Sequence, residues 1–236
     1  MGYVVPFLKR KGGVGASTLA RTYAVEAARS GASVLLVDLD EMQQTSKRWA
    51  DHRRANGLKP EIRAEVATPR LAYDLADQAE VTVIDTPPGW QDKQRMFVAK
   101  WSTFCVVPSR ANRMDDLHET VRLLYAFRKN GIQDWRFGVA FNGLRAATAE
   151  KDDADARAYL AEVGFQALPG YTRDMRGYEV ALLEGRAITE TGQKALNDEA
   201  FTLVNGIAGA VIEAARTYDK LMELKQREPE RDRGRE

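Results

Sequence analysis

A glycine-rich stretch near the start of the chain, KRKGGVGAST at residues 9–18, constrains the fold more than any other segment. An apolar run over residues 3–8 precedes it, and a helical pattern begins at Ser17. A strand, a glycine-rich turn and a helix in this order form a phosphate-binding loop, because backbone N–H groups and the helix N-terminus attract an anion. The glycines permit positive φ and a close approach of the backbone to phosphate.

Apolar runs and helical patterns alternate along the rest of the chain. The patterns predict strands at residues 3–8, 33–38, 62–66, 81–85, 103–108, 136–142 and 165–168, and helices at 17–30, 44–55, 69–78, 114–130, 150–163, 175–184 and 196–224. This alternation predicts an α/β fold, a doubly wound and mostly parallel sheet with helices on both faces and its site at the strand carboxyl ends. We expect a single domain over residues 1–224 and a charged, disordered tail over residues 225–236.

Acidic residues follow two further predicted strands. Asp38 and Asp40 lie in the segment VDLDEMQ, and Asp85 lies in VIDTPPG. A nucleoside triphosphate with Mg²⁺ needs backbone donors for phosphate, oxygen ligands for the ion or its waters, and a group that orients the attacking water. The glycine-rich loop, the hydroxyl of Ser17 and these carboxylates supply all three.

The order K-G-G-x-G-[K]-[ST], starting at Lys11, resembles the deviant Walker A motif of the ParA/MinD family of P-loop ATPases, and the likeness covers roughly residues 3–215. The segment VDLD resembles the family's switch I, and IDTPPG resembles its Walker B motif and switch II. The resemblance implies an ATP-bound homodimer in which Lys11 reaches the partner's phosphates and Asp40 orients the hydrolytic water. It assigns Mg²⁺ to Ser17, Asp38 and Asp85, and ATP or ADP to Lys11, Gly12, Gly13, Val14, Gly15, Ala16, Ser17, Thr18 and Asn142.

The sequence departs from the family pattern at its lysine. Ala16 stands where the P-loop lysine belongs, Arg10 replaces the first glycine of the standard loop, and Glu41 replaces a proline. Without one preorganised donor to the phosphates, hydrolysis is expected to slow by about two decades. An engineered substitution and a natural loss both explain Ala16, and the otherwise complete catalytic set favours engineering.

Within the family, the sequence favours a short partition ATPase, which binds nonspecific DNA and moves cargo under the control of a centromere-binding, ParB-like adaptor. Candidate DNA contacts are basic residues of the C-terminal third, namely Arg173, Arg176, Arg186, Lys194, Arg216 and Lys220. Leu221, Met222 and Leu224 form too small an apolar patch for a membrane helix of the MinD type. A MinD-like membrane-associated ATPase, a natural pseudo-ATPase scaffold and a metabolic enzyme on the same P-loop scaffold remain alternatives.

Composition limits the remaining function classes. The net charge is +1, so contact with DNA depends on a local patch. Cys105 is the single cysteine, which fits a reducing compartment and argues against an iron–sulfur reductase. No membrane-spanning or signal segment is visible, and the expected location is the cytoplasm, in association with the nucleoid.

Overall fold

The computed structural model describes residues 2–227. One seven-stranded sheet forms its centre, and every neighbouring pair of strands runs parallel, in the order β3-β2-β4-β1-β5-β6-β7. The strands are β1 (Tyr3–Phe7), β2 (Val34–Asp38), β3 (Arg63–Val66), β4 (Val81–Asp85), β5 (Cys105–Ser109), β6 (Phe137–Leu144) and β7 (Ala167–Arg173). Because β1 lies between β4 and β5, the loop after β1 lies at the point where the direction of winding reverses, which is where open α/β sheets bind ligands.

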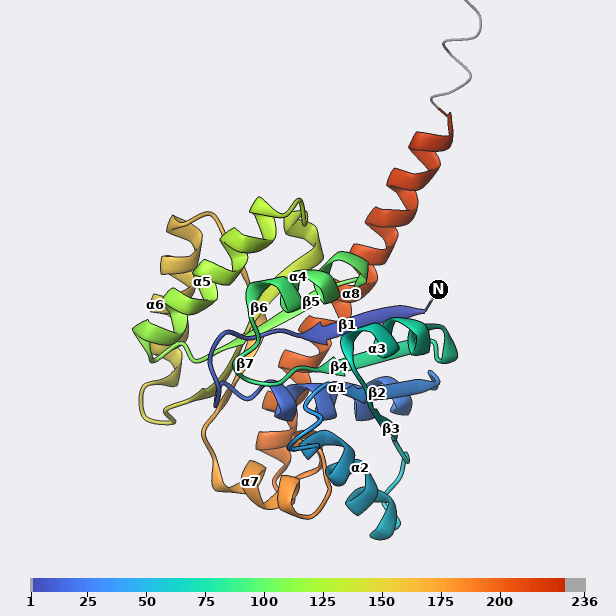
Figure 1. Cartoon of the computed structure of the whole chain (residues 1–236). Helices are drawn as coiled ribbons and strands as arrows, with labels where there is room; N and C mark the ends of the chain where they lie inside the picture. Colours follow the sequence, from blue (N-terminus) through green and yellow to red (C-terminus); the bar gives the residue numbers. More distant parts are fainter. Residues whose placement is uncertain (1, 228–236) are drawn as a thin grey trace, which may run out of the picture.

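Helices cover both faces of the sheet (Figure 1). They are α1 (Ala16–Arg29), α2 (Thr45–Ala55), α3 (Pro69–Leu75), α4 (Asp92–Trp101), α5 (Met114–Lys129), α6 (Ala149–Glu162), α7 (Arg176–Leu183) and α8 (Lys194–Arg227), with 3₁₀ turns η1 (Ala76–Gln78), η2 (Asp134–Arg136) and η3 (Ile188–Glu190). Side chains of α1, α2, α7 and α8 share one buried cluster, and those of α3 to α6 fill the two clusters of the opposite face.

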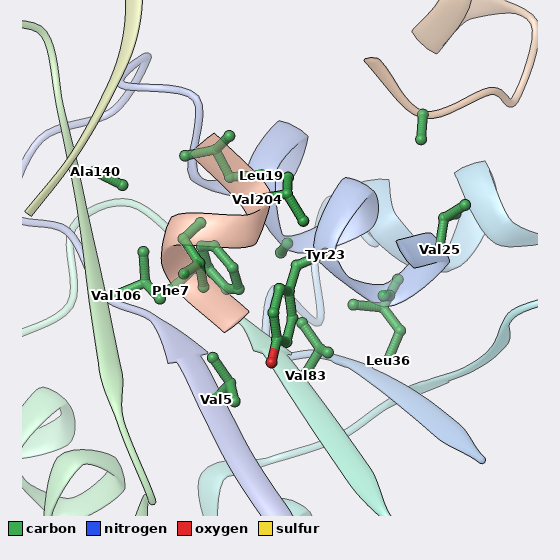
Figure 2. Packing of buried hydrophobic residues seen from close by; sticks show 14 of the residues in the cluster. Val5, Phe7, Leu19, Tyr23, Val25, Leu36, Val83, Val106, Ala140 and Val204 are labelled. Atoms are coloured by element: carbon green, nitrogen blue, oxygen red, sulfur yellow. The ribbon is translucent and has the colours of Figure 1, made fainter. Parts of the chain in front are cut away.

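The core beside α1 holds the phosphate loop in place. Figure 2 shows Phe7 of β1, Leu19 and Tyr23 of α1 and Val204 of α8 packed together above the sheet. Phe7 and Leu19 are fully buried, and each fully buried side chain of this kind contributes roughly 1.5–3 kcal/mol through the hydrophobic effect. The strand before the loop and the helix after it are therefore fixed by the same apolar cluster.

The structure confirms the predicted fold class and differs from the sequence prediction at several elements. Helix α4 was not predicted, and β7 runs through Arg173 rather than ending at Leu168. Helix α8 continues to Arg227, into the segment predicted as a disordered tail, and residues 228–236 of that tail lie outside the described residues. None of the helices within residues 2–227 combines the length and apolar character needed to cross a bilayer.

Candidate nucleotide-binding site

The phosphate loop joins β1 to α1 in the conformation that its glycines allow. Gly13 and Gly15 have φ of 77° and 81°, a left-handed conformation that is unfavourable for other residues. Gly15 is the N-cap of α1, and no side chain caps this helix. The N–H groups of Gly12, Gly13 and Gly15 find no acceptor among the residues that the structure describes. An uncapped helix and free backbone donors at one edge of a sheet form an anion cradle.

Ala16 begins α1 with its side chain in the core rather than in the cradle. It is 2% exposed and packs within the cluster that contains Phe7 and Leu19. Ser17 follows as a half-buried residue of the first helical turn. The cradle therefore has its backbone and a hydroxyl but no cationic side chain from residue 16.

Asn142 of β6 forms a hydrogen bond with the phosphate loop. Its Nδ2 donates to the Val14 carbonyl at 3.4 Å, and its Oδ1 accepts from the Thr172 hydroxyl at 2.6 Å. A Cβ placed on Gly15 would lie 1.7 Å from the same Nδ2. Both ends of this amide are engaged within the protein, so Asn142 positions the loop here, and a contact of Asn142 with adenine stays a prediction.

Asp38 lies at the end of β2 and is fully buried. Its Oδ1 accepts from the Asp40 N–H at 3.0 Å, and its Oδ2 accepts from the N–H groups of Ser46 at 2.7 Å and Lys47 at 3.2 Å. Burial raises the pKa of the Asp38 carboxyl, and the three backbone N–H groups oppose that rise. Asp38 thus caps α2 from the neighbouring strand and fixes the turn that carries Asp40.

Asp85, at the end of β4, keeps one oxygen open. The Ser46 hydroxyl donates to its Oδ2 at 2.6 Å, whereas Oδ1 is buried and has no hydrogen-bond partner among the described residues. Asp85 is adjacent to Asp38 in the β2–β4 register and to Phe7 in the β1–β4 register. Of the two carboxylates assigned to Mg²⁺, Asp85 is the one with an oxygen available for the ion or its waters.

The donor set fits Mg²⁺ only as part of a nucleotide complex. Ser17 and Asp85 offer oxygen ligands, which Mg²⁺ prefers. Among residues 2–227, no group of three or more His, Cys, Asp or Glu side chains forms a metal cage. Mg²⁺ usually binds one or two protein oxygens and completes its shell with phosphates and waters, so the residues present match that mode of binding.

Two cationic side chains that the sequence motifs did not indicate lie near the carboxylates of Asp38 and Asp85. The ammonium of Lys9 donates to the Thr86 carbonyl and lies 3.8 Å from Asp85 Oδ1, and the side chain is only 7% exposed. Burial lowers the pKa of Lys9, and the charges of Asp85, Asp40 and Asp38 oppose that decrease. Arg21 of α1 donates from Nε to the Ser46 hydroxyl at 3.0 Å. For Lys9, the only signal in the sequence was its position directly after a predicted buried strand.

Ser46 connects this cluster to a buried tryptophan on the next turn of α2. Trp49 is 5% exposed, and two guanidinium groups lie near its ring, with Arg21 Cζ and Arg53 Cζ each 5.8 Å from the ring centroid. Its indole N–H donates to the Arg186 carbonyl at 3.3 Å. The carboxylates of Asp38 and Asp85 and the environment of Trp49 are therefore linked through Ser46 and Arg21.

Lys11 lies on the open side of the loop. Its Nζ is 3.0 Å from Asp116 Oδ1 of α5, and its side chain is 42% exposed while that of Asp116 is 6% exposed. Arg10, beside it, pairs with Asp92 at 3.0 Å and Glu119 at 2.9 Å. The residue expected to reach a partner subunit is thus held by its own chain in this structure.

The six basic residues proposed to contact DNA do not form one patch. Four of them pair with carboxylates: Arg173 with Glu199, Arg176 with Glu179, Arg186 with Glu184 and Lys194 with Asp198. Lys194 begins α8, whereas Arg216 and Lys220 lie near its other end. At 1.5 Å per residue, Lys194 and Arg216 are about 33 Å apart along the helix axis. A cavity of 1010 Å³ lies beside Trp101, Trp135 and Tyr218, away from the loop.

Comparisons with known proteins agree with this geometry. The family model described as ATPase MipZ matches residues 3–107, which include the loop, Asp38 and Asp85. No curated protein sequence matches the chain. Many solved structures share its fold.

Three of these structures show the range of similar proteins. The septum site-determining protein MinD of Pyrococcus horikoshii OT3, complexed with Mg-ADP, is 18% identical and has a TM-score of 0.65, with 95% of this chain and 99% of that chain covered. A putative plasmid partition protein of Borrelia burgdorferi B31, bound to AMPPNP, is 12% identical with a TM-score of 0.64, covering 89% and 99%. A ParA family ATPase of Chlorobium tepidum TLS is 16% identical with a TM-score of 0.61, covering 86% and 96%. Residues 3–107 are thus similar to the ATPase MipZ family, and the chain shares its fold with solved MinD and ParA family ATPases.

Proposed function

We propose that the chain is an ATP-dependent partition ATPase that positions DNA or another cargo. The observation that carries the proposal is the meeting of an uncapped glycine loop with the open oxygen of Asp85 at one edge of the sheet. Nucleotides are present in several similar structures, including the MinD complex with Mg-ADP and the partition protein with AMPPNP. The proposed ligands are ATP or ADP with Mg²⁺.

Each residue of the site has a proposed task. The backbone from Gly12 to Thr18 holds the phosphates, and Ser17 with Asp85 binds Mg²⁺ or its waters, while Asp38 fixes the switch turn. Asp40 lies in that turn, where its Oδ1 accepts from the Gln43 N–H at 2.9 Å, and it orients the attacking water. When bound, Mg²⁺ neutralises charge that develops on the phosphates.

Turnover by this chain is expected to be slow, because residue 16 contributes no charge to the transition state. Losing one preorganised donor costs about 3 kcal/mol, or about two decades in rate. The substitution Ala16→Lys should therefore raise ATPase activity, measured with DNA and adaptor supplied. No gain in turnover would overturn this explanation.

The ATP-bound state is proposed to be a homodimer, in which Lys11 leaves Asp116 and contacts the partner's phosphates. Light scattering with ADP and with ATP tests this directly. A dimer that forms only with ATP supports the proposal, and a monomer with both nucleotides in the wild type and in Ala16→Lys contradicts it. A natural pseudo-ATPase scaffold is a second candidate, favoured by Ala16, and predicts nucleotide-dependent assembly without turnover even after lysine is restored.

Nonspecific DNA binding, recruitment to the nucleoid and release by a ParB-like adaptor complete the proposal. Because four of the six candidate basic residues are already paired, Arg216 and Lys220 are the first to test. DNA affinity that falls steeply with salt and is reduced by charge reversal at these two positions supports a phosphate-backbone contact. Salt-insensitive binding contradicts it.

A further inference from the structure

Two buried polar groups, the Lys9 ammonium and the Asp85 carboxylate, lie close together at the carboxyl ends of β1 and β4, and neither has its full set of hydrogen bonds among the described residues. The Lys9 ammonium has three N–H donors, and only the Thr86 carbonyl accepts from it among the described residues. The nearest carboxylate oxygen, Asp85 Oδ1, is 3.8 Å away, too far for a direct hydrogen bond, and has no other partner. Both side chains are nearly excluded from solvent, at 7% and 3% exposed.

Unsatisfied buried groups of opposite character point to a missing ligand. Buried polar atoms are normally hydrogen-bonded, and each exception needs an explanation. A ligand bound beside these two groups can accept from the ammonium and present a cation or a water donor to the carboxylate. A phosphate group with hydrated Mg²⁺ has both properties, since its oxygens accept from Lys9 and the waters of the ion donate to Asp85.

Lys9 and a lysine at position 16 would reach the phosphate loop from different elements of the fold. Residue 16 belongs to the first turn of α1, and its side chain lies in the apolar core. Lys9 instead leaves the end of β1, two residues after Phe7, which pairs with Asp85 in the parallel register. Its ammonium therefore reaches the carboxyl edge of the sheet from the strand, below the loop.

We propose that Lys9 is the phosphate-binding lysine of this chain and takes over ground-state nucleotide binding from residue 16. The inference rests on the proposed function, because it requires that the loop bind a Mg²⁺-nucleotide. It concerns affinity rather than turnover, since a lysine that approaches from β1 lies differently from one on α1. Ala16 then removes catalytic power while Lys9 keeps the site able to load.

A purely internal counter-ion is the competing role for Lys9. An ammonium that served only to neutralise Asp85 would sit within direct hydrogen-bond distance of that carboxylate. Lys9 instead donates to a backbone carbonyl, and Arg21 already supplies a second positive charge near Asp38 and Asp85. The counter-ion role predicts that nucleotide affinity does not depend on Lys9 once the fold is intact.

The test measures Mg-ATP affinity by calorimetry in the full chain, with four variants. Lys9→Met removes the charge at similar length, Ala16→Lys restores the motif, and the double variant combines them. Lys59→Met is the matched control, because Lys59 is exposed and pairs with Glu61. Loss of a charge-assisted hydrogen bond to phosphate should weaken ATP binding about 10- to 100-fold in Lys9→Met. Because the substitution also removes a positive charge 3.8 Å from the buried Asp85 carboxylate, it should lower the melting temperature, and affinities are compared at a temperature at which every variant is folded.

Rescue distinguishes phosphate binding from a structural role. Ala16→Lys should restore affinity in the Lys9→Met background and improve it much less in the wild type, because one lysine already contacts the phosphates there. Wild-type affinity in Lys9→Met, or weak binding that Ala16→Lys does not rescue, would overturn the inference and leave the proposed function intact. Absence of ATP binding in both the wild type and Ala16→Lys would overturn the proposed function itself.

Discussion

A buried guanidinium in α2 allows a quantitative prediction about stability. Arg53 is fully buried and forms a double hydrogen bond with Glu190, at 2.6 and 2.9 Å. It also donates to the carbonyls of Pro60 at 2.8 Å, Lys59 at 2.9 Å and Gly185 at 3.2 Å. Arg53 therefore ties the C-terminal half of α2, the helix that begins beside Asp38 and Asp85, to the segment after α7.

Replacing Arg53 by Met should destabilise the fold strongly. Removing one partner of a buried ion pair costs about 3–5 kcal/mol of unfolding free energy, because the remaining charge and carbonyls lose their partners. For a chain of this size, that loss lowers the melting temperature by about 6–20 °C. The double variant Arg53→Met/Glu190→Leu leaves neither charge unpaired, so its loss should be clearly smaller than the sum of the two single losses.

Urea denaturation followed by circular dichroism measures these differences. Arg54→Met is the matched control, because Arg54 is 65% exposed and, within residues 2–227, pairs with Asp51 of the same helix alone. Exposed pairs contribute at most about 1 kcal/mol. A loss in Arg53→Met no larger than that in Arg54→Met would refute the reasoning. Strictly additive losses at Arg53 and Glu190 would also refute it.

The ion pair between Arg53 and Glu190 also predicts how the stability of the fold depends on pH. Burial favours a higher pKa for the Glu190 carboxyl, but hydrogen bonds from Arg53 and the Ala187 N–H, together with the charge of Arg29, lower it below the ordinary value of 4.5. A carboxyl whose pKa is lowered by folding stabilises the folded state above its unfolded pKa and loses this effect as the pH falls through its folded pKa. The stability difference between the wild type and Glu190→Gln should therefore be full at neutral pH and shrink in acid.

Three further predictions concern the loop, the dimer and the core. Gly15→Ala should abolish ATP binding in calorimetry, because its methyl group would lie 1.7 Å from the Asn142 amide in a backbone with φ of 81°. Asp116→Asn should raise the dimer fraction with ATP in light scattering, because Lys11 is no longer held by a carboxylate 3.0 Å away. Cys105 should react with a disulfide reagent only on unfolding, because complete burial raises the pKa of its thiol to about 12.

Each of these three predictions would be contradicted by a specific result. Full ATP affinity in Gly15→Ala would show that the loop moves away from Asn142 at little cost. An unchanged dimer fraction in Asp116→Asn would show that its pair with Lys11 does not compete with assembly. Labelling of Cys105 in the native protein at the rate of an exposed thiol would show that the sheet opens without global unfolding.

The sequence predicted the sheet well because its strands are buried on both faces. Runs such as Val81–Asp85 and Cys105–Ser109 are nearly continuous in apolar residues, and this pattern is typical of central parallel strands. Helix α4 was missed because its sequence, DKQRMFVAKW, begins with polar residues. The edge strand β7 was predicted too short because Pro169 and Gly170 interrupt it, which an edge position tolerates.

Some residues of the candidate site were predictable from the sequence, and others were not. The loop, Asp38, Asp40 and Asp85 were predictable because parallel strands bring their carboxyl ends to one edge. The position of Lys9 beside Asp85 was not predictable, because it depends on contacts with Thr86 and Asp85, which are more than seventy positions away along the chain. Asp116, which holds Lys11, depends likewise on how α5 packs beside the loop.

The surroundings of Trp49 have an optical consequence. Tryptophan emission responds to nearby charge, and the guanidinium groups of Arg21 and Arg53 each lie 5.8 Å from the centroid of this ring. Arg21 is hydrogen-bonded to Ser46, which is bonded in turn to Asp85. A ligand that moved Asp85 at the proposed site would therefore change the charges around this tryptophan, and a change in emission on addition of Mg-ATP, lost in Trp49→Phe, would report it.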